Sequence, residues 1–471
     1  MQRKTKIVAT ISSLNCSTEF IAGLYKAGMN VVRLNTAHMT HEDALEVISN
    51  TRNVSDKIGI LLDTKGPEIR TCDADKPLSV KHGDYIRVKG APNEISREDV
   101  ICVSYEHFVK DVPMGSSILI DDGYIALAVM DKDEEFLFCH VENDGVIHAR
   151  KSINIPSVHV KLPALSEKDK GFIKFAADND LDFIAHSFVR NKQDVIAVQN
   201  ILDEKKSSIK IIAKIENAQG VQNLNEILDH AYGIMIARGD LAVEIPTEQI
   251  PLIQKQIVKI CIERRKPVIV ATQMLHSMIE SPRPTRAEVS DVANACLDHS
   301  DALMLSGETA NGKYPEVAVR TMAKIAEEVE SKRSSFVDVP YSLDNKVTAY
   351  LAKSAVKAAL RLNTKGIVAD SLTGTSILAL AAYRGDNPIY AQVYDNRVMR
   401  MLSLSFGVVA DFIPLDITSA EPLRKSICRL IDDKHFRDND LIIILAGSFG
   451  AKHGASYIEI STADTFKKKC N

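Results

Sequence analysis

The sequence lacks any apolar run that approaches the roughly 20 residues of a membrane-spanning helix, so no membrane partner is expected. It also lacks a surplus of either charge, because 58 Lys and Arg nearly balance 62 Asp and Glu, for a formal net charge of −4. Without a basic surplus we expect no nucleic-acid partner. The first residues pass directly into strand-like sequence, and no signal peptide is expected. These absences predict a globular protein of the cytoplasm.

Paired cysteine spacings are missing too. Isolated cysteines are typical neither of a disulfide framework nor of a zinc site, so we expect reduced thiols, as in a cytosol. The eight cysteines are Cys16, Cys72, Cys102, Cys139, Cys261, Cys296, Cys428 and Cys470.

At 471 residues the chain is too long for one core, and its patterns divide it. Strand-like and helix-like segments alternate through residues 1–66 and again through 162–333. Between them, residues 67–161 show only short alternating segments and turn signals, which predict an inserted small β domain, a β-barrel lid. A linker at 334–345 leads to residues 346–471, where strands and helices alternate again and predict an open α/β domain.

Three strands before the insertion and five after it make eight strand–helix units. Eight such units in succession favour a closed parallel (β/α)8 barrel, although an open doubly wound sheet fits the same alternation. The expected strands cover residues 6–11, 30–35, 58–64, 181–189, 210–216, 233–241, 267–274 and 301–308.

The strand in residues 210–216 carries a cation and an anion at its end. Lys214 and Glu216 are two residues apart, so their side chains project to the same side. A charge on a buried strand is costly unless it has a partner or an ion. Taken alone, the pair could be a simple ion pair at the edge of a sheet.

Other strand ends show the same feature. Barrel enzymes build their sites at the carboxyl ends of the strands, whereas ordinary loop polarity would supply turn residues such as Gly, Asn, Ser and Asp. Charged groups attached directly to apolar runs therefore predict a common active site. The polar strand ends are Arg33, Asn35, Asp63, Thr64, Ser187, Arg190, Lys214, Glu216, Arg238, Asp240, Thr272, Gln273, Ser306 and Glu308.

The composition of this rim indicates its chemistry. Three carboxylates, Glu216, Asp240 and Asp63, suit hard cations, and the first two lie on adjacent strands where they could share one Mg²⁺. Several cations suit an anionic substrate. There is no Gly-x-x-x-x-Gly-Lys-Ser/Thr loop and no Ser-His-Asp set, so we expect phosphoryl transfer outside the P-loop class. The cations are Arg33, Lys214, Arg238 and Arg70.

Six ordered segments resemble the pyruvate kinase family. The resemblance is strong through residue 333 and looser beyond it. It implies a (β/α)8 barrel with an inserted lid and a C-terminal regulatory-type domain, and transfer of a phosphoryl group from phosphoenolpyruvate to ADP in glycolysis. It also implies Mg²⁺ or Mn²⁺, K⁺ and a homotetramer. The segments are residues 30–38, 62–71, 211–217, 236–241, 271–288 and 304–309.

The resemblance also implies roles for residues at the acidic pair. Glu216 and Asp240 match the Mg²⁺ ligands, and Asp240 also belongs to the substrate site. The Gly239 backbone would face the substrate carboxylate. Lys214 would neutralise the phosphoryl group during transfer.

Phosphate clamping is implied for Arg33 and Arg70. Thr272, with Ser306 and Glu308, would lie near the enolate carbon that must be protonated, although Ser306 and Glu308 could instead cap the following turn. The proton donor itself is not identified by the sequence.

A monovalent-cation site is implied at Asn35, Asp63 and Thr64, and Glu68 resembles the K⁺-requiring branch. Lys151 matches a lid lysine that reaches the nucleotide, but could also be a solvated lid residue, and His38 could be a packed loop histidine. The implied nucleotide contacts are Arg70, Lys151, Asn35 and His38.

Three departures from the family pattern concern the same region. Ala37 stands where the family usually has a serine that helps to hold K⁺, so we expect weaker K⁺ binding. Residues 12–15 replace the usual nucleotide-side loop. Ala242 replaces a customary glycine and would narrow the substrate-carboxylate pocket slightly.

The C-terminal domain resembles the family's effector domain, so a phosphorylated effector is a hypothesis. The loop 371–376 could bind phosphate at a helix N-terminus or be an ordinary N-cap loop. A second loop, 447–454, offers Lys452 and His453. Two other functions stay open: a barrel lyase acting on a 2-oxo acid, and an effector-binding paralogue without turnover. The five strands of this domain are expected at 367–370, 389–393, 408–413, 441–446 and 457–461.

Overall fold

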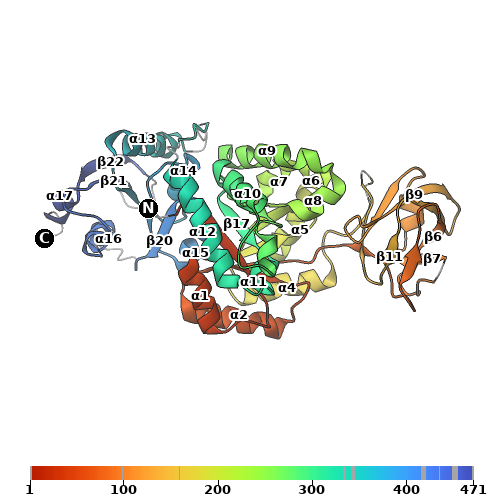
Figure 1. Ribbon diagram of the computed structural model, residues 1–471. Coiled ribbons are helices and arrows are strands. Elements are labelled where there is room, and N and C mark those ends of the chain that lie inside the picture. Colours follow the sequence, from red (N-terminus) through yellow and green to blue (C-terminus); the bar gives the residue numbers. More distant parts are fainter. Residues whose placement is uncertain are drawn as a thin grey trace.

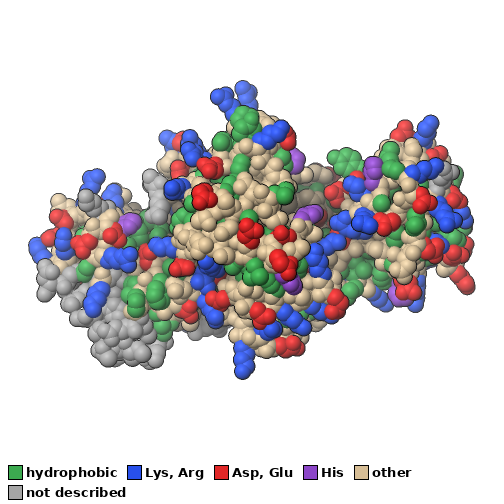
Figure 2. Space-filling model, turned by 90° about the horizontal axis from the view of Figure 1, so that it is seen from below, with side chains coloured by type: hydrophobic (Ala, Val, Ile, Leu, Met, Phe, Trp, Pro, Cys, Tyr) green, Lys and Arg blue, Asp and Glu red, His purple; other side chains and the backbone are tan. Residues whose placement is uncertain are grey.

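The chain forms three lobes in a row, with the barrel between the lid and the C-terminal domain (Figure 1). Figure 2 shows acidic and basic side chains interspersed over the visible face of all three lobes. The computed structural model describes residues 3–97, 99–156, 158, 160–332, 336–340, 345–414, 421–433, 435–447 and 455–468, without the side chains of 421–424 and 426.

Eight parallel strands form the closed central barrel. The predicted barrel is confirmed, and the alternative of an open doubly wound sheet is excluded. The ring is closed where Val8 pairs with Met304, joining the first strand to the last. Nearly every residue of these strands is buried, as expected for strands covered on both faces. In barrel order the strands are β1 (Lys6–Ile11), β17 (Ala302–Leu305), β16 (Val268–Ala271), β15 (Gly233–Ala237), β14 (Lys210–Ile215), β13 (Phe183–His186), β3 (Gly59–Asp63) and β2 (Val31–Asn35).

Helices surround the barrel, and side chains cap the start of several of them. Thr40 and Asp43 form a capping box, as do Thr285 and Glu288, in which each pair satisfies backbone N–H groups that have no partner inside the helix. The helices are α1 (Thr18–Ala27), α2 (His41–Val54), α4 (Glu167–Asp178), α5 (Lys192–Glu204), α6 (Ala218–Gln222), α7 (Leu224–His230), α8 (Arg238–Glu244), α9 (Ile250–Glu263), α10 (Arg286–Leu297), α11 (Gly307–Ala310) and α12 (Pro315–Ser331).

Several strands end earlier than predicted. The prediction of a strand at 233–241 is wrong after Ala237, because the next residues form α8. Likewise the strand at 301–308 ends at Leu305, and α11 follows. Beyond the edge of the sheet the backbone has no neighbouring strand to bond, so it turns into a helix. The polar residues at these ends therefore sit on turns and helix starts.

The inserted lid is a seven-stranded sheet with its own apolar core. A bridge between Thr71 and Val103 joins the chain just after the first strand of this sheet to its last strand, so the sheet closes on itself. A separate pair, β11 (Gly145–Ile147) with β5 (Leu78–Val80), and the short helix α3 (Phe108–Asp111) complete the lid. The sheet order is β4 (Ile69–Arg70), β12 (Ser152–Asn154), β8 (Ser117–Ile120), β9 (Ile125–Lys132), β10 (Leu137–Val141), β6 (Tyr85–Gly90) and β7 (Val100–Val103).

The C-terminal domain is the expected five-stranded open sheet, parallel except for its last strand. Its strand order is β20 (Val408–Phe412), β19 (Ile389–Val393), β18 (Gly366–Ser371), β21 (Leu441–Ala446) and β22 (Tyr457–Thr462). Its helices are α13 (Lys346–Leu362), α14 (Thr375–Ala382), α15 (Asn396–Met401), α16 (Glu421–Asp432) and α17 (Ala463–Lys468), with the short turn η3 (Leu402–Leu404). The residue boundaries between the three lobes stay predictions.

Buried ion pairs hold the C-terminal domain against the amino-terminal end of the barrel. Arg384 binds both carboxylate oxygens of Asp301 at 2.8 and 2.6 Å, and both side chains are buried. Lys6, the first residue of β1, donates a hydrogen bond to the Val408 carbonyl. The lid attaches at the opposite, carboxyl-terminal end of the strands. The polar strand ends therefore face the lid and not the C-terminal domain.

One expectation about cysteine is wrong. Cys428 is disulfide-bonded, whereas six other cysteines are free and buried. The long separations between cysteines in the sequence say nothing about which of them meet in space, so this bond had no signal. No helix among the described residues is both long enough and apolar enough to cross a membrane.

Candidate active site

A cavity of about 350 Å³ lies where the carboxyl ends of the barrel strands meet the lid. The cavity opens on the inward face of the strands. The barrel interior is filled by side chains such as Ile212 on β14 and Leu61 on β3. Because strand side chains alternate, Lys214 and Asp63 continue these inward rows at the mouth. The predicted site residues that line the cavity are Arg33, Asn35, Asp63, Thr64, Arg70, Lys151, Lys214, Glu216 and Asp240.

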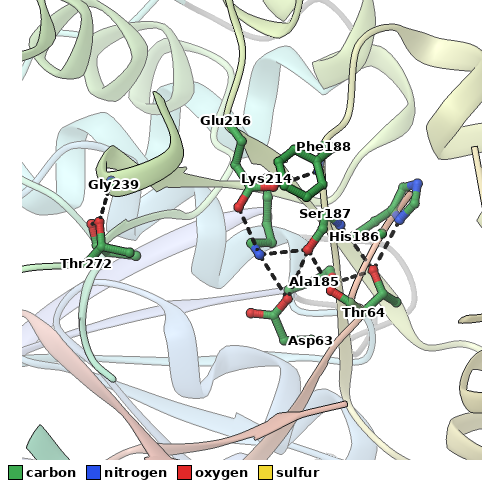
Figure 3. Close-up of polar contacts among 12 residues, drawn as sticks. Asp63, Thr64, Ala185, His186, Ser187, Phe188, Lys214, Glu216, Gly239 and Thr272 are labelled. Atoms are coloured by element: carbon green, nitrogen blue, oxygen red, sulfur yellow. Dashed lines mark hydrogen bonds and ion pairs between the residues drawn. The ribbon is translucent and has the colours of Figure 1, made fainter. Parts of the chain in front are cut away.

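Lys214 stands at the centre of this cavity, and all three of its N–H groups are used (Figure 3). Its Nζ lies 2.7 Å from Ser187 Oγ, 2.9 Å from a Glu216 oxygen and 3.1 Å from an Asp63 oxygen. Burial alone would lower the pKa of Lys214, but the charges of Asp63 and Glu216 outweigh burial and raise it above its ordinary value. Lys214 is therefore a permanent cation that can neutralise charge without giving up a proton.

Asp63 joins the two cations nearest the barrel axis. One of its oxygens lies 2.7 Å from Arg33 Nε and the other 3.1 Å from Lys214 Nζ. Burial opposes ionisation of this carboxyl, but the two cations together hold its pKa below the usual value. Arg33 also donates to Thr10 Oγ1 at 3.0 Å, which fixes its guanidinium on the floor of the cavity.

Glu216 and Asp240 form an acidic pair that is set up for a cation. Burial raises the pKa of Glu216 to about 7, and burial also raises the pKa of Asp240. Each of the two carboxyl groups also influences the pKa of the other, and both line the same cavity, so both could touch one ion. Glu216 is held in place because its second oxygen accepts the Phe188 N–H at 2.7 Å.

The donor set of this pair fits Mg²⁺, a hard cation that binds through one or two carboxylates and keeps several further oxygen ligands from water or substrate. Within the described part of the chain, no group of three or more His, Cys, Asp or Glu side chains is placed to hold a metal. A metal held by Glu216 and Asp240 would have further coordination positions for oxygen ligands, including water and substrate.

The Gly239 N–H donates to Thr272 Oγ1 at 2.8 Å, and Gly239 precedes Asp240 at the start of α8. Thr272 has a φ of +69°, and its neighbour Gln273 has a φ of +54°. A β-branched residue seldom adopts this left-handed conformation, and such strain tends to persist at functional positions. Thr272 is thereby fixed beside the acidic pair, although it does not line the cavity itself.

The cavity lining does not include the predicted site residues His38, Gly239, Thr272, Ser306 and Glu308. The buried Glu308 carboxylate accepts the N–H of Leu275 at 3.1 Å and the N–H of Ser306 at 2.8 Å. Both of its oxygens thus serve the backbone, which supports the capping interpretation.

The expectation that Arg238 adds a cation to the rim is wrong. Its guanidinium is bound by both oxygens of Asp291 at 2.7 Å and by the Thr272 carbonyl at 2.8 Å. Met235 faces the barrel interior whereas Ile236 faces the helices, so strand alternation directs Arg238 outward, away from the inward row.

The lid brings Arg70 and Lys151 over the cavity. Arg70 is bound to Glu68 at 2.7 Å and to the Arg150 carbonyl at 2.6 Å. Lys151 lies 3.0 Å from Asp121, a neighbour on the lid. Both cations are half-exposed, so they are available to an anionic ligand.

Sequence reasoning missed several lining residues. Ser187 was recognised only as a polar strand end, yet it holds Lys214. Glu68 was noticed only through the family resemblance. The sequence around the acidic lid residues Asp121 and Asp122 predicts a turn and gives no indication of a function. The missed residues are Lys65, Glu68, Asp121, Asp122, Ser152, Ser187 and Phe188.

The candidate effector loops are described only in part. In the loop 371–376, Ser371 Oγ accepts the Gly374 N–H at 3.0 Å, and the hydroxyls of Thr373 and Thr375 lie 2.9 Å apart. These local bonds fit an ordinary loop before α14. Lys452 and His453 lie outside the described residues.

Comparisons with known proteins match this architecture along nearly the whole chain. The family model described as "Pyruvate kinase, barrel domain" matches residues 2–319, and "Pyruvate kinase, alpha/beta domain" matches residues 350–461. A pyruvate kinase of Borreliella burgdorferi is 45% identical over 98% of both chains. A pyruvate kinase of Geobacillus stearothermophilus is 42% identical over 95% of this chain and 78% of its own. A solved pyruvate kinase structure from Cryptosporidium parvum has a TM-score of 0.91 and 36% identity, covering 98% of this chain and 96% of its own.

Proposed function

This chain belongs to the pyruvate kinase family, and we propose that the cavity around Lys214 is where it carries out the family's reaction. The reaction transfers the phosphoryl group of phosphoenolpyruvate to ADP, giving pyruvate and ATP in glycolysis. The observation that carries the assignment of the site is the set of contacts around Lys214. A buried ammonium group between Ser187, Asp63 and Glu216 is preorganised to face a negatively charged group in transfer.

Phosphoryl transfer requires positioning and charge neutralisation more than covalent chemistry. Arg33 on the cavity floor and Arg70 on the lid hold the phosphate from two sides, while Lys214 neutralises the group as it moves. Lys151 contacts the nucleotide from the lid, with Asn35 and His38 as further nucleotide contacts.

The substrate carboxylate is held at the start of α8, where the Gly239 backbone and Asp240 lie. Thr272 is placed near the enolate carbon that receives a proton. Glu308 supports this arrangement from behind, because it anchors the Leu275 N–H three residues beyond Thr272. Ser306, whose N–H donates to Glu308, is part of the same support.

Two cations complete the site. Glu216 and Asp240 would hold Mg²⁺ or Mn²⁺, which when bound supplies positive charge to the phosphoryl and enolate oxygens. Asn35, Asp63 and Thr64 would hold K⁺ through oxygen donors. All three line the cavity, and Ala37 beside them contributes no hydroxyl, so this site has one oxygen ligand fewer than the family pattern.

Further proposals concern the protein as a whole. We place it in the cytoplasm as a homotetramer, in keeping with its family. A phosphorylated effector at the C-terminal domain also remains a proposal. Activity measured with and without sugar phosphates at subsaturating phosphoenolpyruvate tests it, and an unchanged rate would reject it.

One coupled assay tests the proposed function. Purified protein is given phosphoenolpyruvate, ADP and Mg²⁺, with and without K⁺, and both pyruvate and ATP are followed. We expect equal amounts of the two products, and a higher rate with K⁺. Pyruvate formed without ADP would instead indicate a lyase, and ligand binding without turnover would indicate an effector-binding paralogue.

A further inference from the structure

A second, smaller cavity of about 120 Å³ lies beneath the hinge of the lid. The two chain segments that connect the lid to the barrel form one wall, and the barrel rim near α6 and α8 forms the other. Figure 1 shows α6 and α8 on the side of the barrel that faces the lid. Glu244, the last residue of α8, lines this cavity together with Asn154 and Ala218.

The Glu244 carboxyl group reaches two other elements. The backbone N–H of Ala218 and the side chain of Asn154 lie beside it on the same cavity wall, and both favour its ionised form. Ala218 is the first residue of α6, where a backbone N–H has no partner inside the helix. Asn154 is the last residue of β12, the lid strand that leads back to the barrel.

Each of these three elements also carries a residue of the proposed site. Asp240 lies one helical turn before Glu244 on α8, and therefore on the same face of the helix. Glu216 lies two residues before Ala218, and Lys151 lies three residues before Asn154. One carboxyl group thus joins the two acidic ligands to the strand that bears the nucleotide lysine.

Burial makes this carboxyl group sensitive to the loss of its partners. The cavity wall is largely apolar, and burial raises the pKa of Glu244 to about 7. A buried acid that loses a hydrogen-bond donor keeps the cost of desolvation without the compensating bond. The other charged groups on the wall are Glu68 and Arg190. Arg190 is bound to Asp194 and to the Leu162 carbonyl, and it fixes the second connection of the lid in the same way.

We propose that Glu244 is a positioning residue that sets the angle of the lid relative to the acidic pair, and so brings Lys151 to the nucleotide. The proposal rests on the proposed function for the roles of Lys151, Glu216 and Asp240. In this proposal the contact between Glu244 and Asn154 sets the affinity for the nucleotide. The contact between Glu244 and Ala218 holds the segment that bears Glu216, and so sets the affinity for the metal.

The test compares Glu244→Ala, Glu244→Gln and Asn154→Ala with a matched control, Glu248→Gln. Glu248 lies on the exposed turn η1 (Thr247–Gln249), four residues further along the chain. For Glu244→Ala we expect the KM for ADP and the half-saturating Mg²⁺ concentration each to rise about tenfold, the effect of losing one hydrogen bond to a charged group. The kcat should change by less than about threefold on the same scale.

The other variants separate the two contacts. Asn154→Ala should raise the KM for ADP alone, because the Ala218 contact remains. Glu244→Gln should restore most of the affinity for ADP, because its amide oxygen still accepts an N–H and its amide nitrogen can bond Asn154. Glu248→Gln should behave like the unmodified chain. An unchanged KM for ADP in both Glu244→Ala and Asn154→Ala would overturn the proposal, as would an equal fall in kcat with both affinities intact.

Hydrogen exchange provides a readout that does not depend on turnover. In Glu244→Ala the backbone amides of residues 152–155 should exchange several-fold faster than in Glu248→Gln, while the barrel strands stay protected. Unchanged exchange there would also overturn the proposal. If the unmodified chain formed no pyruvate, the proposed function would fail, but the hinge contact would still be judged by the exchange experiment. If Glu244→Ala does not fold, Asn154→Ala carries the test.

Discussion

Ser187 Oγ lies 2.7 Å from Lys214 Nζ and donates its own hydrogen to the Thr64 carbonyl at 2.6 Å. The serine hydroxyl therefore orients the ammonium group and joins it to a residue of the proposed K⁺ site. We expect Ser187→Ala to lower kcat about tenfold, because a hydrogen bond to a charged group contributes about 1.5–3 kcal/mol. Steady-state kinetics at saturating substrates measure this effect. Ser187→Thr, which keeps the hydroxyl, serves as the control, and an unchanged kcat in Ser187→Ala would contradict the expectation.

Replacing Lys214 should affect turnover and stability together. We expect Lys214→Ala to lower kcat by about a thousandfold or more, since it removes the preorganised charge at the site. It also leaves Asp63 and Glu216 as buried carboxylates without their shared partner, so the free energy of unfolding should fall by about 3–5 kcal/mol. Chemical denaturation alongside kinetics tests both parts, with Lys214→Arg as the charge-preserving comparison.

Ala37 lacks the hydroxyl of the family pattern, so adding one should strengthen K⁺ binding. Ala37 lines the cavity next to Asn35, whose side-chain oxygen accepts the Ala37 N–H at 3.2 Å. We expect Ala37→Ser to lower the half-saturating K⁺ concentration several-fold, because it adds an oxygen donor beside Asn35, Asp63 and Thr64. Activity titrated with KCl at constant ionic strength measures it. No shift in the K⁺ titration would argue that the cation sits elsewhere or uses backbone oxygens alone.

Lys6 predicts a pH dependence at the junction between barrel and C-terminal domain. Burial, with a smaller contribution from Arg3, lowers the pKa of Lys6 to about 7. The folded chain thus releases this proton more easily than the unfolded chain, in which the pKa is near 10.5. Stability contributed by this group is therefore present above about pH 10.5 and is lost as the pH falls through about 7.

Replacing this lysine by an apolar residue should remove that dependence. We expect the unfolding free energy of the unmodified chain, relative to Lys6→Met, to rise by a few kcal/mol between pH 7 and pH 10, as linkage requires. Thermal or urea unfolding across this range measures the difference. Parallel curves for the two proteins would show that the ammonium group stays charged in the folded state.

The sequence predicted the barrel and much of its mouth because both depend on short-range patterns. Buried parallel strands appear as continuous apolar runs, and the alternation of side chains places Lys214 and Glu216 on one side. The same rule brings Arg33 and Asp63 to the inward face. These positions follow from strand parity alone, and each of them lines the cavity.

The rest depended on contacts between distant residues. Glu308 looked like a rim carboxylate, but the Leu275 N–H from a neighbouring loop occupies it. Arg238 looked like a rim cation, but it lies on the outer face of its strand's alternation and is bound by Asp291 of α10. Asn154 gave no signal at all, because its importance comes from a partner 90 positions away in the sequence. A local sequence pattern cannot identify such partners, because the packing of separate elements determines which residues meet.

Strand β1 has Lys6 at one end, in contact with the C-terminal domain, and Thr10 near the other, in contact with Arg33. An extended strand that is bonded on both sides by neighbours is stiff along its axis and has little freedom to stretch. A shift of the C-terminal domain at Lys6 would therefore move the whole strand along its axis. Arg33, which contacts Thr10, would move with it. In this molecule, remote control of catalysis would need no change of shape along the way.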